Sequence, residues 1–148
     1  MPARWLMPLA FLLLFPHLKP EYFTQFSMLN TAFTAARVLS FCALLFLCIY
    51  VRRRLSWMTA AVFFYLGWLS WSTLHNALPL SAVFATVVST ASMALLIDCF
   101  ADDLPALIDA AMLLMELLHY GNIVTMLVFP DGLYQTMTTG NNWLLGYA

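Results

Sequence analysis

Long apolar runs separated by short polar breaks dominate this sequence. The runs occupy residues 5–18, 31–51, 57–74, 80–100 and 104–129. A helix needs about 20 apolar residues to cross a bilayer, and four of the runs have this length. The run at 5–18 would form only about 21 Å of helix, so a re-entrant placement or a thinned membrane stays open for it. The pattern predicts an all-α, polytopic transmembrane helical bundle of about five spans, followed by a tail at 130–148.

Composition supports a membrane location. Hydrophobic residues make up 64% of the 148 residues, and charged residues only 9%, whereas a soluble domain carries about 25% charged residues. The first predicted partner is therefore the lipid bilayer. The six basic residues form no continuous basic surface, which excludes nucleic acid as a partner.

Three adjacent arginines, Arg52–Arg54, interrupt the second and third apolar runs. Each guanidinium would cost roughly 2.5–3.5 kcal/mol at the centre of a bilayer, so this turn must lie at a membrane surface. Short loops rich in arginine are retained in the cytoplasm. Counting spans from this point predicts a cytoplasmic N-terminus and an external tail.

The cysteine and histidine residues predict neither a metal site nor a cofactor. Cys42, Cys48 and Cys99 show no C-x-x-C spacing, and the expected role of each is a small apolar side chain in a helix. His75 and His119 lie at different predicted depths, which disfavours a haem held by two histidines.

The run at 80–100 carries small residues at four-residue spacing. One series is Ser81, Ala85 and Ser89, and a parallel series begins at Ala82. Small residues in this arrangement let helices approach closely within a bilayer. We expect one of these two faces to contact another helix.

The last apolar run contains polar residues at membrane depth. Asp109, Glu116 and Tyr120 lie nearly on one line along a helix, flanked by His119 and Asn122. Ionisable groups at this depth normally face a protein interior or a watery cavity. Two structural alternatives stay open: Asp109 reaches the cytoplasmic interface, and Glu116 bonds to a neighbouring helix.

Arg37 is the natural counter-charge for Glu116. Arg37 lies about 21 Å and Glu116 about 17 Å from the cytoplasmic boundary, at 1.5 Å per helical residue. These similar depths predict an ion pair between the second and fifth spans. A substrate phosphate or a position at the external rim would explain Arg37 equally well.

Three phrases resemble a known family. The sequence LFPHLKPEYF at Leu14–Phe23, the phrase FPDGLY at Phe129–Tyr134 after Asn122, and NWLLGY at Asn142–Tyr147 are similar, in order and spacing, to segments of bacterial O-antigen and capsular polysaccharide polymerases. These proteins are grouped with the O-antigen ligases. The resemblance extends over the whole chain, but it covers only the N-terminal part of a family member.

The resemblance implies a multi-pass protein of the bacterial cytoplasmic membrane. Its members transfer a glycan from a polyprenyl diphosphate carrier to a sugar hydroxyl at the outer face, without a metal or a cofactor. The elements implicated in transfer lie further along such proteins, so no catalytic residue is carried over to this sequence and the segment alone is expected to be inactive. Arg37 and Lys19 are the residues that could assist the anionic carrier. Glu116, His119 and Asn122 join Arg37 as the candidate polar group within the membrane.

Two other classes of function stay open. The chain could be a small non-enzymatic membrane subunit whose helices pack against a partner subunit or against further helices of a longer chain. It could also belong to a transporter with Glu116 in an ion path.

Overall fold

The computed structural model describes residues 5–52, 55–136 and 140–145. Arg53 and Arg54 of the arginine turn, and Gly146 and Tyr147 of the last phrase, lie outside the described residues. The α-helices are α1 (Leu6–Leu14), α2 (Ser27–Phe46), α3 (Trp57–His75), α4 (Ser81–Cys99) and α5 (Leu104–Val128). Shorter elements are the 3₁₀ helices η2 (Phe15–His17) and η3 (Glu21–Gln25), the π-helix η4 (Leu47–Arg52), and the strands β1 (Tyr134–Thr136) and β2 (Gly140–Asn142).

The helical fold class predicted from the apolar runs is confirmed. Three helical segments are long and apolar enough to cross a membrane: Ser27–Val51, Ser81–Cys99 and Leu104–Val128, with mean hydropathies of 2.1, 1.8 and 1.5. The chain is therefore a membrane protein. The apolar helix Leu6–His17 is shorter and extends only about 18 Å. The second helix begins four residues earlier than predicted, at Ser27 rather than at residue 31.

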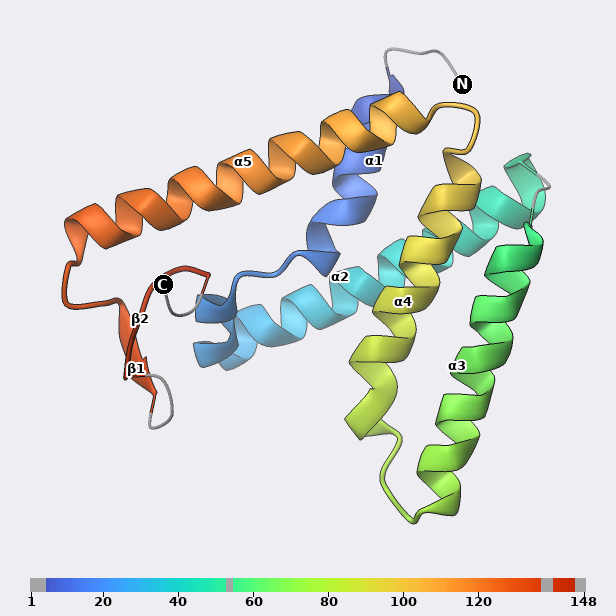
Figure 1. Cartoon of the computed structure of the whole chain (residues 1–148), viewed down its shortest axis with the longest axis horizontal. Helices are drawn as coiled ribbons and strands as arrows, with labels where there is room; N and C mark the ends of the chain where they lie inside the picture. Colours follow the sequence, from blue (N-terminus) through green and yellow to red (C-terminus); the bar gives the residue numbers. More distant parts are fainter. Residues whose placement is uncertain (1–4, 53–54, 137–139, 146–148) are drawn as a thin grey trace.

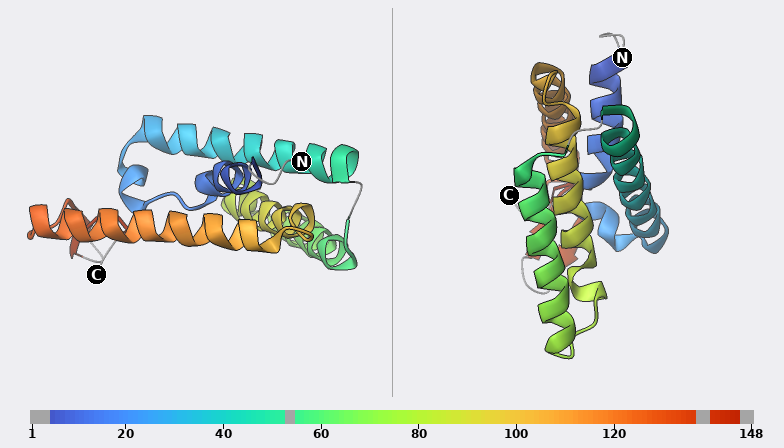
Figure 2. Two further views of the ribbon diagram at one scale, coloured as in Figure 1. Left: turned by 90° about the horizontal axis from the view of Figure 1, so that it is seen from above. Right: turned by 90° about the vertical axis from the view of Figure 1, so that its right-hand side faces the viewer.

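The helices form three layers (Figures 1 and 2). Seen from above, α2 and α5 lie on opposite sides, and α1 and α4 lie between them. The α3 helix packs along α4 as an antiparallel neighbour, and α4 in turn contacts α2. The α1 helix makes its most extensive contact with α5. This arrangement separates α2 from α5, with consequences for the predicted ion pair.

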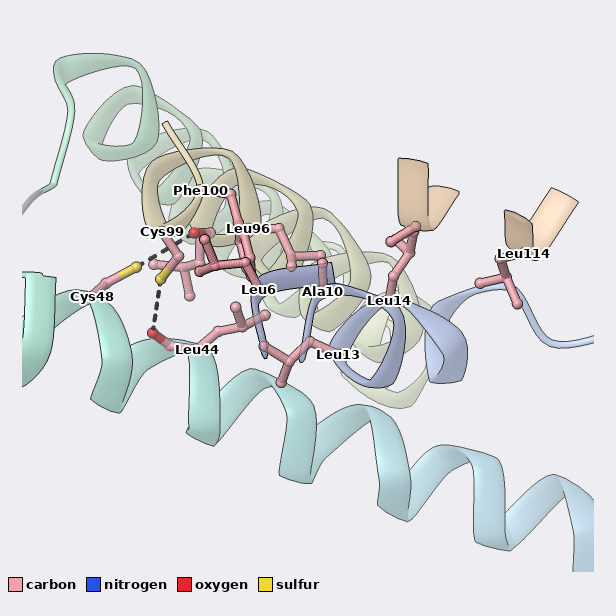
Figure 3. Packing of buried hydrophobic residues seen from close by; sticks show 12 residues of the cluster. Leu6, Ala10, Leu13, Leu14, Leu44, Cys48, Leu96, Cys99, Phe100 and Leu114 are labelled. Carbon is pink, nitrogen blue, oxygen red and sulfur yellow. Dashed lines mark hydrogen bonds between the residues drawn. The ribbon is translucent and has the colours of Figure 1, made fainter. Parts of the chain in front are cut away.

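The core lies where α1, α2, α4 and α5 meet (Figure 3). Leu6, Ala10 and Leu13 on α1 face Leu44 on α2 and Leu96 on α4. The other buried members are Leu14, Cys48, Leu95, Cys99, Phe100, Ala110 and Leu114. The thiol of Cys48 donates to the carbonyl oxygen of Leu95 at 3.4 Å, and that of Cys99 to the carbonyl oxygen of Leu44 at 3.8 Å. The interpretation of these two cysteines as small core residues is confirmed.

The buried face of α4 differs from the predicted one. Ser81, Ala82 and Ala85 are exposed, and both small-residue series lie largely on the exposed side of the helix. The buried side carries Val88, Ala91, Ser92, Leu95 and Leu96. Val88, Leu95 and Leu96 bury more apolar surface than Ser or Ala would, and the small Ala91 and Ser92 are buried beside them. The predicted packing face was therefore wrong.

The start of α3 and the turn between α4 and α5 lie at the same end of the molecule (Figure 1). The backbone N–H of Ser56 donates to Oδ2 of the buried Asp98 at 2.8 Å. The Ser56 hydroxyl oxygen accepts the N–H of Thr59 at 3.1 Å and so caps α3. The first of these bonds joins the start of α3 to the end of α4, two points that the sequence predicts to lie at one membrane surface.

At the opposite end, the chain after α5 forms a small antiparallel hairpin. Tyr134 of β1 pairs with Asn142 of β2. The turn predicted at Pro130–Gly132 is present, since the N–H of Gly132 donates to the carbonyl oxygen of Phe129 at 2.9 Å. Gly132 has a φ of 90°, a conformation that other residues rarely adopt. The hairpin itself was not predicted.

Candidate functional site

The four residues predicted as one polar group lie at three separate places. Arg37 is half-buried on α2, while Glu116 and His119 are exposed on α5. The Nδ1–H of His119 donates to the carbonyl oxygen of Met115, one turn earlier on its own helix, at 2.8 Å. Asn122 is half-buried near the end of α5 and contacts the tail.

The predicted pair of Arg37 and Glu116 is absent, and that prediction was wrong. The α1 helix occupies the space between α2 and α5 (Figure 2), with Ala10 and Leu14 buried in the same cluster as Ala110 and Leu114. Similar depths in a membrane do not make two helices neighbours. Arg37 lies instead beside the C-terminal end of α1, where it bonds to the carbonyl oxygen of Pro16. A position at the external rim of the membrane stays a prediction.

Arg37 bonds to the backbone of the first helical segment. Its Nε donates to the carbonyl oxygen of Pro16 at 2.9 Å, and the Ser40 hydroxyl, one turn later, donates to the carbonyl oxygen of Leu13 at 2.7 Å. The last carbonyl groups of a helix lack partners within that helix. The α2 side chains satisfy two carbonyls at the end of α1 and η2, where a cation is also favoured by the helix dipole.

Lys19 lies in the same place. Its Nζ donates to Oδ1 of Asn30 at 2.7 Å, which ties the segment before η3 to α2. Partial burial lowers the pKa of Lys19, and the positive charge of Arg37 lowers it further, while Glu21 acts in the opposite direction. Arg37 and Lys19 therefore lie close enough for their charges to repel each other.

His17, which directly follows Pro16, completes what we call the Arg37 cluster: His17, Lys19 and Arg37. Burial, and secondarily the charge of Arg37, lower the pKa of His17 to about 4. The imidazole is thus neutral at physiological pH. Both ring nitrogen atoms are buried, and they have no hydrogen-bond partner within the described part of the chain. Sequence reasoning missed this residue. Its position between two prolines in Pro16–Pro20 was the available signal.

Aromatic rings of the neighbouring segments pack against one another at this end of the molecule. Phe33 on α2 has its ring centroid 5.6 Å from that of Phe15 and 5.5 Å from that of Phe23. Tyr22 of η3 lies 5.6 Å from Tyr134 of β1 by the same measure. Burial, and secondarily the charge of Glu21, raise the pKa of Tyr134. Rings with a polar tip are typical of membrane–water interfaces, which is where the topology places this end.

Hydrogen bonds among the described residues hold the tail against this end. The N–H of Tyr22 donates to the carbonyl oxygen of Leu144 at 3.2 Å. The Asn122 side chain accepts the N–H of Leu145 through Oδ1 at 3.0 Å. The Trp143 indole Nε1–H donates to the carbonyl oxygen of Phe129 at 2.9 Å. The role of Asn122 that the structure describes is thus to position the tail.

These contacts bring the three family-like phrases together. Residues 14–23 and 129–134, with 142–145 of the last phrase, meet at the end of the molecule that carries η3, the start of α2 and the hairpin (Figure 1). More than 100 residues separate the first phrase from the others along the chain. The end of the bundle where the phrases meet therefore carries both cationic and aromatic side chains.

The chemistry available here is the binding of an anion. Two cations and a neutral imidazole present N–H groups, and Glu21 is exposed beside them. No group of three or more His, Cys, Asp or Glu side chains suited to a metal ion occurs among the described residues.

In comparisons with known proteins, no protein-family model, no curated protein and no solved structure matches this chain.

Proposed function

We propose that this chain is the N-terminal membrane segment of a polysaccharide polymerase or ligase of the O-antigen type. It would lie in the bacterial cytoplasmic membrane with its N-terminus in the cytoplasm. One observation carries the proposal: the three phrases similar to this family pack against one another at one end of the bundle, through Tyr22, Tyr134 and Leu144.

The Arg37 cluster gives this end of the molecule a role in the proposed reaction. Polymerases and ligases of this type handle a glycan attached to a polyprenyl diphosphate. Arginine and lysine bind phosphate oxygens through charge-assisted hydrogen bonds, and cations near a leaving diphosphate stabilise the charge that develops on it. Arg37 and Lys19 would hold the carrier diphosphate at the outer surface. We assign no residue of this chain to the transfer step itself.

Deletion of the gene in its source bacterium tests the proposal. The expected result is a loss of long surface polysaccharide, with accumulation of lipid-linked single repeat units or of unligated glycan. Gel separation of the surface glycans, together with mass spectrometry of the extracted polyprenyl lipids, would detect both changes. Surface polysaccharide of unchanged length and amount would overturn the proposal. Complementation with the intact gene controls for effects on neighbouring genes.

The exposed polar residues of α5 favour a second candidate, a membrane subunit that packs against other helices. Glu116 and His119 are exposed on a segment long and apolar enough to span the bilayer. A carboxyl group facing lipid at this depth is unfavourable, so a partner subunit, or further helices of a longer chain, would cover it. Replacing Glu116 with Gln or Leu distinguishes the cases. A subunit interface predicts weaker assembly with the partner, as measured by co-purification, whereas a lipid-facing position predicts a higher yield with Leu.

A further inference from the structure

We propose that His17 is a third phosphate-binding group of the Arg37 cluster and donates a ring N–H to the phosphate that Arg37 and Lys19 attract. The inference rests on the proposed function, because it assigns a further residue to the site where the carrier diphosphate would be held. It concerns a residue that neither the family-like phrases nor the predicted polar group marked as a binding residue.

The first observation is the burial of both imidazole nitrogen atoms. Neither has a hydrogen-bond partner in the described part of the chain. A buried polar atom without a partner costs about 1–3 kcal/mol, and the great majority of such atoms in native proteins are satisfied. An apolar side chain at this position would avoid that cost. An unmet donor and an unmet acceptor therefore point to a group that binds here.

The second observation is the excess of donors around the imidazole. The bond from Arg37 to the carbonyl oxygen of Pro16 uses Nε, which leaves the terminal guanidinium N–H groups available. No carboxylate forms an ion pair with Arg37 within residues 5–52, 55–136 and 140–145. Lys19 uses one of its N–H groups on Asn30. The exposed Glu21 carboxylate lies near Lys19, but donors still outnumber acceptors in the cluster. Such an excess suits a ligand that consists mainly of acceptor oxygens, as a phosphate does.

The third observation is the order of the groups along the chain. Pro16, whose carbonyl holds Arg37, directly precedes His17, and Lys19 follows two residues later. The bond from Arg37 Nε to the carbonyl oxygen of Pro16 at 2.9 Å places the guanidinium beside the residue that precedes His17. In agreement with this position, the charge of Arg37 adds to the effect of burial in lowering the pKa values of His17 and Lys19. A phosphate bound between the two cations would lie next to the imidazole. Water alone could satisfy the ring nitrogens, but it would not neutralise the two neighbouring charges.

The experiment uses the whole chain in phosphatidylcholine nanodiscs with ¹⁵N-labelled histidine. The probe is farnesyl diphosphate, and farnesol serves as the matched control without phosphate. The chain has three histidines, and the variants His17→Asn and His75→Asn assign their signals. The proposal predicts that farnesyl diphosphate shifts the ring ¹⁵N signals of His17 and that farnesol does not. It also predicts that His17→Asn weakens binding by about tenfold or more, whereas His75→Asn, at the exposed end of α3, leaves it unchanged.

The outcomes separate the inference from the proposed function. If the probe binds, and Arg37→Gln weakens binding while the His17 signals stay unchanged, the inference is overturned and the assignment of the cations stands. A failure of the wild-type protein to bind the probe would overturn both the inference and the carrier-binding role. The glycan phenotype of the gene deletion would still test the proposed function by itself. Should His17→Asn fail to fold, the variants His75→Asn and His119→Asn assign the other two histidine signals, and the remaining wild-type signals belong to His17.

Discussion

Arg37 on α2 donates a hydrogen bond from Nε to the carbonyl oxygen of Pro16, 21 residues earlier in the chain, at 2.9 Å. This bond replaces the ion pair that the charges alone suggested. A backbone carbonyl at the end of a helix is a strong acceptor because it has no partner within its own helix, and the guanidinium meets it without the cost of burying a second charge. The bond fixes the end of α1 against α2 and sets the position of the neighbouring imidazole.

Removal of the Arg37 guanidinium should destabilise the protein. Arg37→Met keeps much of the apolar stem but leaves the Pro16 carbonyl without its donor, and we expect a loss of about 1–3 kcal/mol in the free energy of unfolding. The change would appear as a lower midpoint in denaturant unfolding of the protein in detergent micelles. Glu116→Gln is the matched control, since the exposed Glu116 makes no ion pair with Arg37, and its effect should stay within about 0.5 kcal/mol. Equal losses in the two variants would contradict the structure.

The buried face of α4 supplies a second prediction. Ser92 is 0% exposed, and its hydroxyl donates to the carbonyl oxygen of Val88 at 2.8 Å. Ser92→Leu should lower the folded yield in detergent, because a larger side chain at a packed position typically costs about 1–3 kcal/mol. Ala85→Leu, on the exposed side of the same helix, should leave the yield unchanged. The opposite ranking of the two variants would restore the small-residue face as the contact surface.

Asp98 should stabilise the protein as a hydrogen-bond acceptor rather than only through its charge. Its Oδ2 accepts the N–H of Ser56, and the residue is 8% exposed. Asp98→Ala leaves this N–H without its acceptor and should cost about 1–3 kcal/mol. Asp98→Asn keeps an oxygen at the same position and should retain most of the stability. Thermal unfolding followed by circular dichroism would rank the three proteins, and equal loss in both variants would assign the effect to charge.

Much of the fold followed from the apolar runs because membrane-spanning helices need a minimum length, and this length is visible in one sequence. The predicted ranges of α3, α4 and α5 agree with the structure to within about one residue at each end. Which side of each helix is buried could not be predicted from the sequence in the same way. The α4 helix carries apolar residues on all of its sides. The sequence pattern therefore could not distinguish the face that carries Val88 and Leu95 from the one that carries Ala85.

The candidate site was predictable only in part, since its bonds go to the backbone and between segments remote in the chain. The sequence identified Arg37 and Lys19 as cations near one surface, but a carbonyl acceptor such as that of Pro16 has no sequence signature. The hairpin escaped prediction because β2 is Gly140–Asn142, and Gly and Asn are depleted in strands. Its position depends on the bond between Tyr22 and Leu144.

The proposed orientation can be tested by labelling from the outside of intact cells. Asp131 and Ala101 are both exposed, in the turn after α5 and in the turn before it. A membrane-impermeant thiol reagent should label Cys at position 131 and should not label Cys at position 101 until the cells are opened. Serine should first replace the three native cysteines, since its hydroxyl can still donate to the carbonyl oxygens that Cys48 and Cys99 contact. Labelling of position 101 alone in intact cells would show that the orientation is the reverse of the predicted one.

Acidification should destabilise the protein through His17. The pKa of this imidazole is lowered from 6.5 to about 4 in the folded chain by burial, and further by Arg37, so the unfolded chain binds more protons between these two values. Stability from this group is therefore complete above pH 6.5 and falls as the pH drops towards 4. The loss is below about 1.4 kcal/mol per pH unit, because solvent screens the partly exposed ring.

The measurement is the free energy of unfolding at several pH values for the wild-type protein and for His17→Gln, in which this titration is absent and the other groups titrate as before. The difference between the two proteins should shrink or change sign between pH 6.5 and 4 and stay constant above pH 7. A constant difference across the whole range would mean that His17 has the same proton affinity in the folded and unfolded chains, and that its ring is not held neutral beside Arg37.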